Sequence, residues 1–357
     1  MLTYWLMFVV AAGVALARTE QGYAFASQRD SLRPWFIGWA LLTLLVGYRF
    51  EVGGDWGNYL WNYFQSEQFT LAELVSEHGD PAYSVVSKIS TEAGWGIYGI
   101  NLICGGIFCA GLVAFCRAQP RPWLALVAAI PYLVIVVGMG YTRQAAAIGL
   151  LMFGMVQLGR DETAKFVFWI ALGAAFHKSA LIMLPIAILA RIHNPWWTAF
   201  WVGATGIFLY FLLLAEYADT LIQNYILAEY ESEGATVRVS MNAVPGVFYL
   251  FFRHHLTENS FECRLWTWIA LLAVAFVPLL LFSPSSTAVD RVALYLIPIQ
   301  LYVLSRLPDL FPRESRGLPI FGVVALCGLV QFVWLNFAAN ARSWIPYRFY
   351  PLEFWFS

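Results

Sequence analysis

The sequence is short of charge. Asp, Glu, Lys and Arg make up 12% of its 357 residues, whereas soluble globular proteins carry about 25%. Hydrophobic residues reach 60%, which is more than a soluble surface and core accommodate together. The formal net charge of −1 excludes the basic field that nucleic-acid binding requires. These shortages predict an all-α polytopic integral membrane protein, with residues 1–357 forming one membrane domain.

Cysteine pairs and lysine are also scarce. The five cysteines show no CxxC spacing, and four lie in or beside apolar stretches, which indicates packed thiols rather than disulfides or ligands. HExxH, EF-hand and P-loop patterns are missing, so we expect no metal and no cofactor. Only three of the 21 basic residues are lysine. Arginine suits bidentate binding of a diphosphate, but a GC-rich genome produces the same bias.

Long runs without charge predict about 10–12 transmembrane helices. A span needs roughly 20 apolar residues, or fewer where its ends are wet. The first run is expected to stay as a signal-anchor helix. The runs are 2–17, 34–48, 96–116, 123–142, 144–159, 166–190, 196–214, 243–252, 265–282, 291–305 and 318–339.

Arginine and lysine in the short loops predict the orientation. Loops 18–33, 117–121, 160–165 and 306–316 are basic and are expected in the cytoplasm. Segment 49–95 then forms an outer loop, in agreement with its seven acids against two basic residues, and 215–242 forms a second outer loop. Apolar residues at helical spacing in 67–77 and 217–230 predict amphipathic helices along the outer interface.

The run 166–190 has two interpretations. As a single span it places Arg191 outside and upsets the parity of the later loops. As two short helices that meet near His177-Lys178, it places Arg191 inside. We favour this broken or re-entrant helix, which is tolerated where it is buried or lines a wet cavity.

The stretch after the second run carries the richest set of reactive residues. Arg49 is suited to bind an anion, and the Gly53-Gly54 pair allows a tight turn near a ligand. Asp55 is a candidate base, while Trp56 and Tyr59 offer flat faces for sugar rings. The alternative is an aromatic belt beside a glycine turn.

Two further stretches place charge inside or between apolar runs. Arg143, followed by Gln144, is either a phosphate contact or a snorkelling side chain. His177 is a candidate general acid, general base or phosphate donor, and Lys178 lies beside it. Charge within an apolar run is expensive and favours function, although a lone histidine also serves helix packing.

The last candidates lie in the C-terminal half. Arg291 and Tyr295 are spaced to share one helix face. An Asp290–Arg291 surface pair of little energetic value is the alternative. Arg238 is a further outward arginine at the end of the second outer loop.

In this order, these stretches resemble the EpsG family of Wzy-type polysaccharide polymerases. The resemblance covers nearly the whole chain, although Gly54 and Trp56 depart from the family pattern. It is carried by Tyr48-Arg49, Gly53-Gly54-Asp55, Tyr59, Asp80-Pro81-Ala82-Tyr83, Arg143-Gln144, Phe176-His177-Lys178-Ser179-Ala180-Leu181 and Arg291 with Tyr295.

The resemblance implies a multi-pass protein of the bacterial inner membrane with its active site facing the periplasm. Its substrate would be an undecaprenyl-diphosphate-linked oligosaccharide within the membrane lipid, and its expected partner a polysaccharide chain-length regulator. It would act as a metal-independent glycosyltransferase, joining repeat units into an exopolysaccharide or O-antigen. An O-antigen-ligase-like or other lipid-linked glycosyltransferase is the first alternative, and a lipid-linked sugar flippase or transporter is the second.

This chemistry assigns each candidate residue a role. Fixed arginines stabilise the charge that develops on a leaving diphosphate. The expected catalytic residues are Asp55, His177 and Arg49; the diphosphate-binding residues are Arg143, Arg291, Arg238 and Lys178; and the sugar-binding residues are Trp56, Tyr59 and Tyr295.

Overall fold

The computed structural model describes residues 1–18, 32–191, 234–257, 259–283 and 286–356, with isolated positions at 196, 197, 200 and 204. The predicted span 196–214 and the predicted amphipathic helix 217–230 lie outside the described residues. The described part of the chain is almost entirely helical, and one isolated antiparallel bridge joins Arg49 to Phe349.

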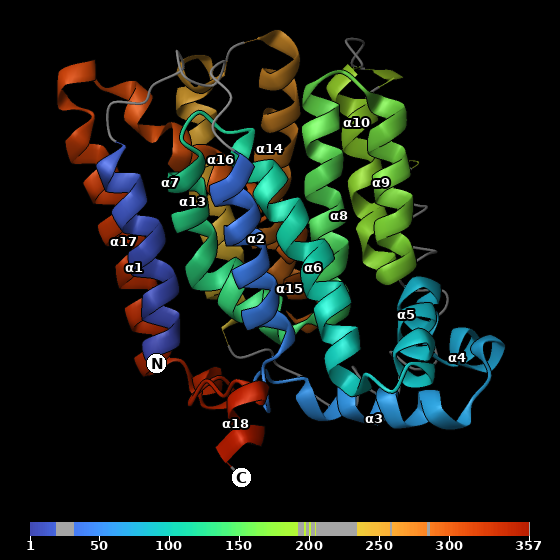
Figure 1. Ribbon diagram of the computed structural model, residues 1–357. Coiled ribbons are helices and arrows are strands. Elements are labelled where there is room, and N and C mark those ends of the chain that lie inside the picture. The colour runs from blue at the N-terminus through green and yellow to red at the C-terminus, as the bar shows by residue number, and fades with distance from the viewer. Residues whose placement is uncertain are drawn as a thin grey trace.

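Most helices stand side by side in a bundle (Figure 1). Most of these helices coincide with the apolar runs of the sequence to within a few residues. The bundle helices are α1 (Leu2–Ala17), α2 (Leu32–Gly47), α6 (Gly96–Arg117), α7 (Pro122–Ala129) continued by the π-helix η2 (Ile130–Gly138), α8 (Thr142–Gly159), α9 (Thr163–Phe176), α10 (Leu184–Arg191), α13 (Ala235–Leu256), α14 (Ser260–Phe282), α15 (Ser286–Ala293), α16 (Pro298–Arg306) and α17 (Gly317–Phe337).

Four described helices, α6, α13, α14 and α17, are long and apolar enough to cross a membrane. A fifth span results if α15 and α16, with their 3-10 turns, count as one segment bent by 43°. Helices α1, α2, α7 with η2, and α9 are shorter but apolar. The all-α polytopic membrane architecture is therefore confirmed, while the number of about 10–12 spans stays a prediction.

The predicted break at His177 is present. Helix α9 ends at Phe176, His177 is extended (φ −159°, ψ 112°), and a 3-10 segment, η3 (Lys178–Met183), leads into α10. At the far end of α10, the Arg191 guanidinium lies 2.5 Å from the Asp161 carboxylate, next to the start of α9. Residues 163–191 thus run along the bundle in α9, turn at His177 and run back in α10. We call these residues the helical hairpin.

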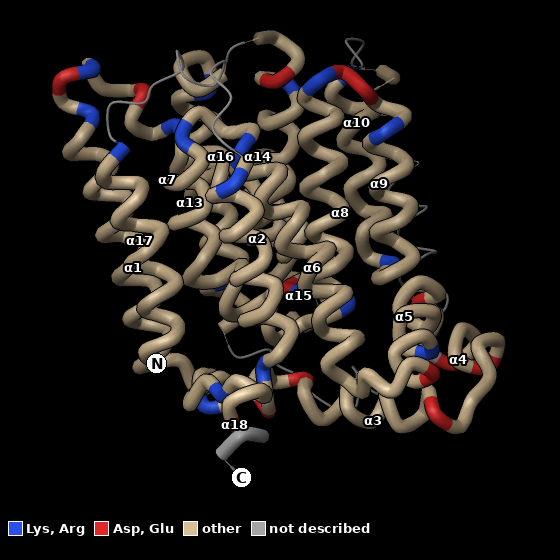
Figure 2. The backbone as a smooth tube through the Cα atoms, viewed as in Figure 1, with Lys and Arg blue, Asp and Glu red and all other residues tan. Residues whose placement is uncertain are grey.

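Both ends of the bundle carry acidic and basic residues, but in a different balance (Figure 2). Basic residues gather where α6 meets α7, where α8 meets α9 and between α16 and α17; we call this the basic end. The opposite, acidic end carries residues 48–95. There α3 (Trp56–Gln68) lies across the bundle, followed by α4 (Leu71–His78) and α5 (Pro81–Glu92) (Figure 1). The predicted amphipathic helix 67–77 is divided, because Thr70 and Glu73 form a capping box that starts α4.

Helix α13 corrects the predicted second outer loop. It begins at Ala235 rather than after residue 242, so the short run 243–252 is part of a 22-residue helix. Its first two turns contain Arg238 and the polar residues Ser240 and Asn242, so they do not belong to the apolar run. Two of these side chains are satisfied inside the bundle, Arg238 by Asp290 and Asn242 by the Ala293 carbonyl.

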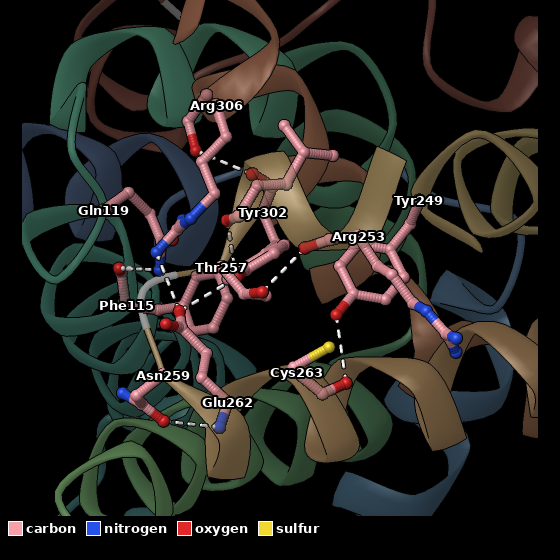
Figure 3. A network of polar contacts seen from close by, with 12 residues as sticks. Phe115, Gln119, Tyr249, Arg253, Thr257, Asn259, Glu262, Cys263, Tyr302 and Arg306 are labelled. Carbon is pink, nitrogen blue, oxygen red and sulfur yellow. Dashed lines mark hydrogen bonds and ion pairs between the residues drawn. The ribbon is translucent and has the colours of Figure 1, made fainter. Parts of the chain in front are cut away.

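At the basic end, a polar network fixes the helix termini (Figure 3). The Arg306 guanidinium lies 3.7 Å from the Tyr302 ring centroid and 3.1 Å from Glu262 Oε1, and it also donates to Gln119. The Tyr302 hydroxyl donates to the same Glu262 oxygen at 2.9 Å. The network joins the turn after α6 to the start of α14 and the end of α16, so it holds the bundle closed at this end.

Candidate functional site

A tight turn after α2 carries the acidic end. Gly53 has φ of 109°, and a Cβ there would lie 2.4 Å from the Met139 carbonyl oxygen, so only glycine fits. Its amide donates to the Ser343 carbonyl at 2.8 Å. The group that lies close to Gly53, and that makes glycine necessary there, is therefore protein backbone and not a ligand. The turn places Asp55 at the N-cap position, directly before α3.

Arg49 lies at the centre of this end and is 1% exposed. Its guanidinium donates to the Val46 and Val52 carbonyls and to the side chains of Asn101 (3.2 Å) and Thr142 (2.7 Å). Burial lowers the pKa of Arg49 to about 10, so the group stays charged at neutral pH. Arg49 thus ties α2 to α6 and α8, and the structure does not bring it to an open surface.

In the part of the chain that the structure describes, three aspartate–arginine pairs lie at the acidic end. Arg238 Nε lies 2.5 Å from Asp290 Oδ1, with side chains 14% and 6% exposed, and Arg143 Nη1 lies 2.8 Å from Asp80 Oδ2. In the third pair, Arg291 Nη2 is 3.6 Å from Asp55 Oδ2, and the side chains are 43% and 24% exposed. This separation exceeds a hydrogen bond, so the third pair is the open and loosely held one.

Tyr59 lies between two of these pairs. Burial raises the pKa of its hydroxyl, while Arg143, Asp55 and Arg291 all act on it electrostatically. The Arg143 guanidinium also lies 6.0 Å from the Tyr59 ring centroid. The open pair and the Asp80–Arg143 pair therefore belong to one cluster.

Tyr141 connects the open pair to the third arginine. Burial raises the pKa of its hydroxyl, and Arg238, Asp290, Asp55 and Arg291 all lie within electrostatic range. The Arg291 guanidinium stands 5.7 Å from the Tyr141 ring centroid. Hence Arg291 occupies the middle of a row of charges that runs from α8 to α13. We call the three pairs and these two tyrosines the charge cluster.

Asp80 binds the outer helices to the bundle. Its carboxylate accepts hydrogen bonds from Arg143 and from the backbone N–H of Lys178. Burial raises the pKa of Asp80, and the two partners offset part of that rise. The sequence offered Asp80 only as part of a motif without a role. Its position directly before Pro81, at the start of α5, was the available signal.

His177 and Lys178 reach the charge cluster from the helical hairpin. The half-buried His177 ring lies within electrostatic range of Arg143 and Arg291, and its Nδ1 accepts from the Ser179 N–H at 3.4 Å. Lys178 Nζ reaches the αL turn at Gly79, where an added Cβ would be 2.9 Å from it. The break in the hairpin therefore places both side chains at the acidic end.

The predicted sugar-binding aromatics are less open than expected. Tyr59 is 6% exposed and lies under Arg143, so it supports that arginine. Trp56 is half-buried, with its ring centroid 6.3 Å from that of Phe50 and 6.2 Å from that of Tyr98. Tyr295 is fully buried. Of the three, only Trp56 presents part of its surface outside.

The expectation that Arg291 and Tyr295 share a helix face is wrong. Helix α15 ends at Ala293 and tightens into a 3-10 turn over Leu294–Leu296, where residues four apart no longer align. The alternative Asp290–Arg291 pair is also not formed, because neighbouring residues on a helix point in different directions. Asp290 instead faces Arg238.

This arrangement offers a carboxylate and several fixed cations, but few metal ligands. Among the described residues, no group of three or more His, Cys, Asp or Glu side chains is placed to hold a metal ion. Asp55 can accept a proton, and Arg291 and Arg143 can stabilise an anion beside it. The arrangement suits the displacement of an anionic leaving group by a hydroxyl.

Similarity to one protein family extends across nearly the whole chain. The EpsG family model matches residues 33–349, from the start of α2 to the segment that pairs with Arg49. No curated protein and no solved structure matches. The chain therefore belongs to the EpsG family, which is associated with Wzy-type polysaccharide polymerases.

Proposed function

We propose that this protein joins undecaprenyl-diphosphate-linked oligosaccharide repeat units into a surface polysaccharide. The observation that carries the proposal is the open Asp55–Arg291 pair, which lies between two more buried aspartate–arginine pairs. A general base thus stands beside a cation that water and substrate can reach. Membership of the EpsG family adds independent support for a polymerase-like membrane glycosyltransferase.

In the proposed reaction, Asp55 takes the proton from the attacking sugar hydroxyl of a new lipid-linked unit. The hydroxyl oxygen bonds to the anomeric carbon of the growing glycan, and the bond from that carbon to the lipid diphosphate breaks. The diphosphate leaves with the bonding electrons, and Arg291 and Arg143 stabilise its growing charge. His177 is a second donor to the diphosphate or an alternative base.

The remaining predicted residues have supporting roles in this proposal. Arg238 completes the row of cations from α13, and Lys178 holds the helical hairpin close to Asp80. Arg49 positions the turn that carries Asp55 and does not itself touch substrate. Trp56 contacts sugar with its exposed part.

The charge distribution supports the proposed setting. Basic loops face the cytoplasm in membrane proteins, so the acidic end and its charge cluster would face the periplasm of a bacterial inner membrane. Lipid-linked units would arrive within that membrane. A chain-length regulator would then act beside the polymerase at the same end.

A glycan ladder from cells that lack the gene tests the proposal. Asp55→Asn and Arg291→Gln should abolish the ladder and leave single-repeat glycan on the surface, since one lost donor costs about 3 kcal/mol in comparable sites. Arg348→Gln, which removes an exposed partner of Glu51 at the same end, is the matched control and should keep the ladder.

Membrane levels of all variants must be equal. A full ladder from Asp55→Asn would overturn the assignment of the base. Loss of all surface glycan, single repeats included, would instead favour a ligase or a transporter.

A further inference from the structure

An apolar groove of about 560 Å³ runs along the bundle between α13, α16, α17 and η2. From α13 it is lined by Val237, Met241, Val244 and Phe248, whose spacing of three and four residues marks one helix face. Its volume falls in the range of about 300–1,000 Å³ that is typical of small-molecule sites. The groove is therefore large enough for part of a ligand.

The mouth of the groove opens sideways from the bundle. Val237, Val244 and Leu326 line it and are 63%, 68% and 49% exposed, whereas Val303 and Cys327 are buried at its floor. A side opening between spans gives onto the hydrocarbon core of a bilayer. A lipid chain could enter without leaving the membrane.

The amide in the floor of the groove is already bonded within the protein. Gln300 lines the groove, but its side-chain amide donates to Asn242 Oδ1 at 2.7 Å. Asn242 in turn donates to the Ala293 carbonyl at 2.7 Å. The rest of the lining is mostly apolar, which suits an aliphatic chain rather than a sugar.

Helices η2 and α13 link the groove to the charge cluster. Tyr132 of η2 lines the groove, and its hydroxyl lies within electrostatic range of Arg238, Asp290 and Tyr141. Val237 of α13 also lines the groove, and the next residue, Arg238, bonds to Asp290, so the groove lies beside the charge cluster. A lipid with its chain in the groove would present its headgroup to that row.

We propose that this groove binds the part of the polyprenyl chain nearest the diphosphate in the lipid-linked substrate. The inference rests on the proposed function and names where that substrate is held. The apolar lining accounts for the chain, and the adjacent cations account for the anionic headgroup.

Groove-filling variants of the purified protein in nanodiscs test the assignment. Val244→Trp and Leu326→Trp should raise KM for a full-length undecaprenyl donor by about tenfold, equivalent to about 1.4 kcal/mol of binding. Val247→Trp and Leu329→Trp are matched controls, since both residues are exposed on the same two helices but lie outside the groove. A donor with a short prenyl chain should be used equally well by all four variants. Equal KM values for the full-length donor would overturn the inference.

A binding measurement separates this inference from the proposed function. A photo-crosslinker replaces Val244 or, as the control, Val247, and the probe is undecaprenyl diphosphate without sugar, in excess phosphatidylglycerol. We expect labelling of position 244 by the probe and not of 247. Labelling of 244 by phosphatidylglycerol alone would show a bulk-lipid surface, and no labelling would show a covered surface. Either result would overturn the inference. If the wild type fails to polymerise yet 244 is labelled by the probe, the proposed function falls and the binding site stands.

Discussion

Exposure separates the roles of the three aspartate–arginine pairs at the residue scale. Ion pairs removed from water bind each other and resist exchange with ligands, whereas a pair in contact with water can give up its partner. Asp290–Arg238 is the most buried pair and Asp55–Arg291 the most exposed. The site therefore combines rigid supports with one pair that is free to react.

Removing one member of a buried pair should destabilise the protein more than removing both. We expect Arg143→Met to lower stability by about 3 kcal/mol at neutral pH, because it leaves the buried Asp80 carboxylate without its charge partner. The double variant Asp80→Asn with Arg143→Met should recover most of that loss but stay inactive. Thermal unfolding in detergent measures both, with Glu51→Gln, from the exposed pair with Arg348, as the control that changes little. Additive losses in the double variant would contradict the account.

The stability of the same region should depend on pH. Burial raises the pKa of Asp80 in the folded protein, so the native state keeps a proton that the unfolded chain has already lost. Stability from this group is then greatest below the ordinary aspartate pKa and falls as pH rises through the folded value. Unfolding temperatures measured at acidic to neutral pH should show this fall in the wild type and a smaller one in Asp80→Asn. An increase with pH that depends on Asp80 would contradict it.

The sequence identified most charged residues of the site but not their partners. Arg49 stands at the end of an apolar run and looks like an anion ligand, yet it bonds to Asn101 and Thr142, which are 52 and 93 residues away. Contacts over such distances depend on how helices pack. Asp80 was part of a quoted motif, but its role was not predicted. That role depends on contacts with Arg143 and Lys178, which only the folded chain brings together.

At the scale of elements, the apolar runs predicted the positions of most bundle helices, and a polar interruption predicted the break. His177-Lys178 interrupts an otherwise apolar run, and the chain does turn there. The same rule failed at α13, where Arg238 and Asn242 lie inside the helix. Arg238 and Asn242 are tolerated inside the helix because both form hydrogen bonds within the bundle. Sequence periodicity cannot show such bonds.

The helical hairpin predicts the sidedness of Arg191. In cells carrying the protein with Cys263 replaced by alanine, a membrane-impermeant maleimide should label Glu67→Cys at the acidic end. It should label Arg191→Cys only after permeabilisation, because Arg191 lies beside Asp161 at the basic end. Cys263 is replaced because it is only partly buried and could react with the maleimide, whereas the other four native cysteines are buried. Labelling of Arg191→Cys in intact cells would contradict the hairpin.

Helices α6 and α8 cross at a pair of glycines. A Cβ on Gly111 would lie 1.9 Å from the Gly149 carbonyl oxygen, a close approach typical of small residues between membrane helices. Gly111→Ala should therefore cost about 1–3 kcal/mol of stability, since the backbones must separate. Gly322→Ala, which has open space around it, is the control. Equal unfolding temperatures for the two variants would show that the helices do not cross there.

At the scale of the whole molecule, the two ends of the bundle have different roles. The basic end is fixed by the network around Arg306 and Glu262 (Figure 3). The acidic end gathers the charge cluster, the turn at Gly53 and the helical hairpin, and the groove opens beside it. Placing the reactive pair at one end of the bundle suits an enzyme that works at one membrane surface.

The most direct test of polymerisation uses the purified protein with undecaprenyl-diphosphate-linked repeat units in proteoliposomes, with products analysed by mass spectrometry. We expect lipid-linked glycans of increasing length, and one free undecaprenyl diphosphate for each new linkage. Asp55→Asn should lower the rate by about 100-fold or more, and Arg348→Gln should not. Intact repeat units without new linkages, or an unchanged rate in Asp55→Asn, would contradict the account.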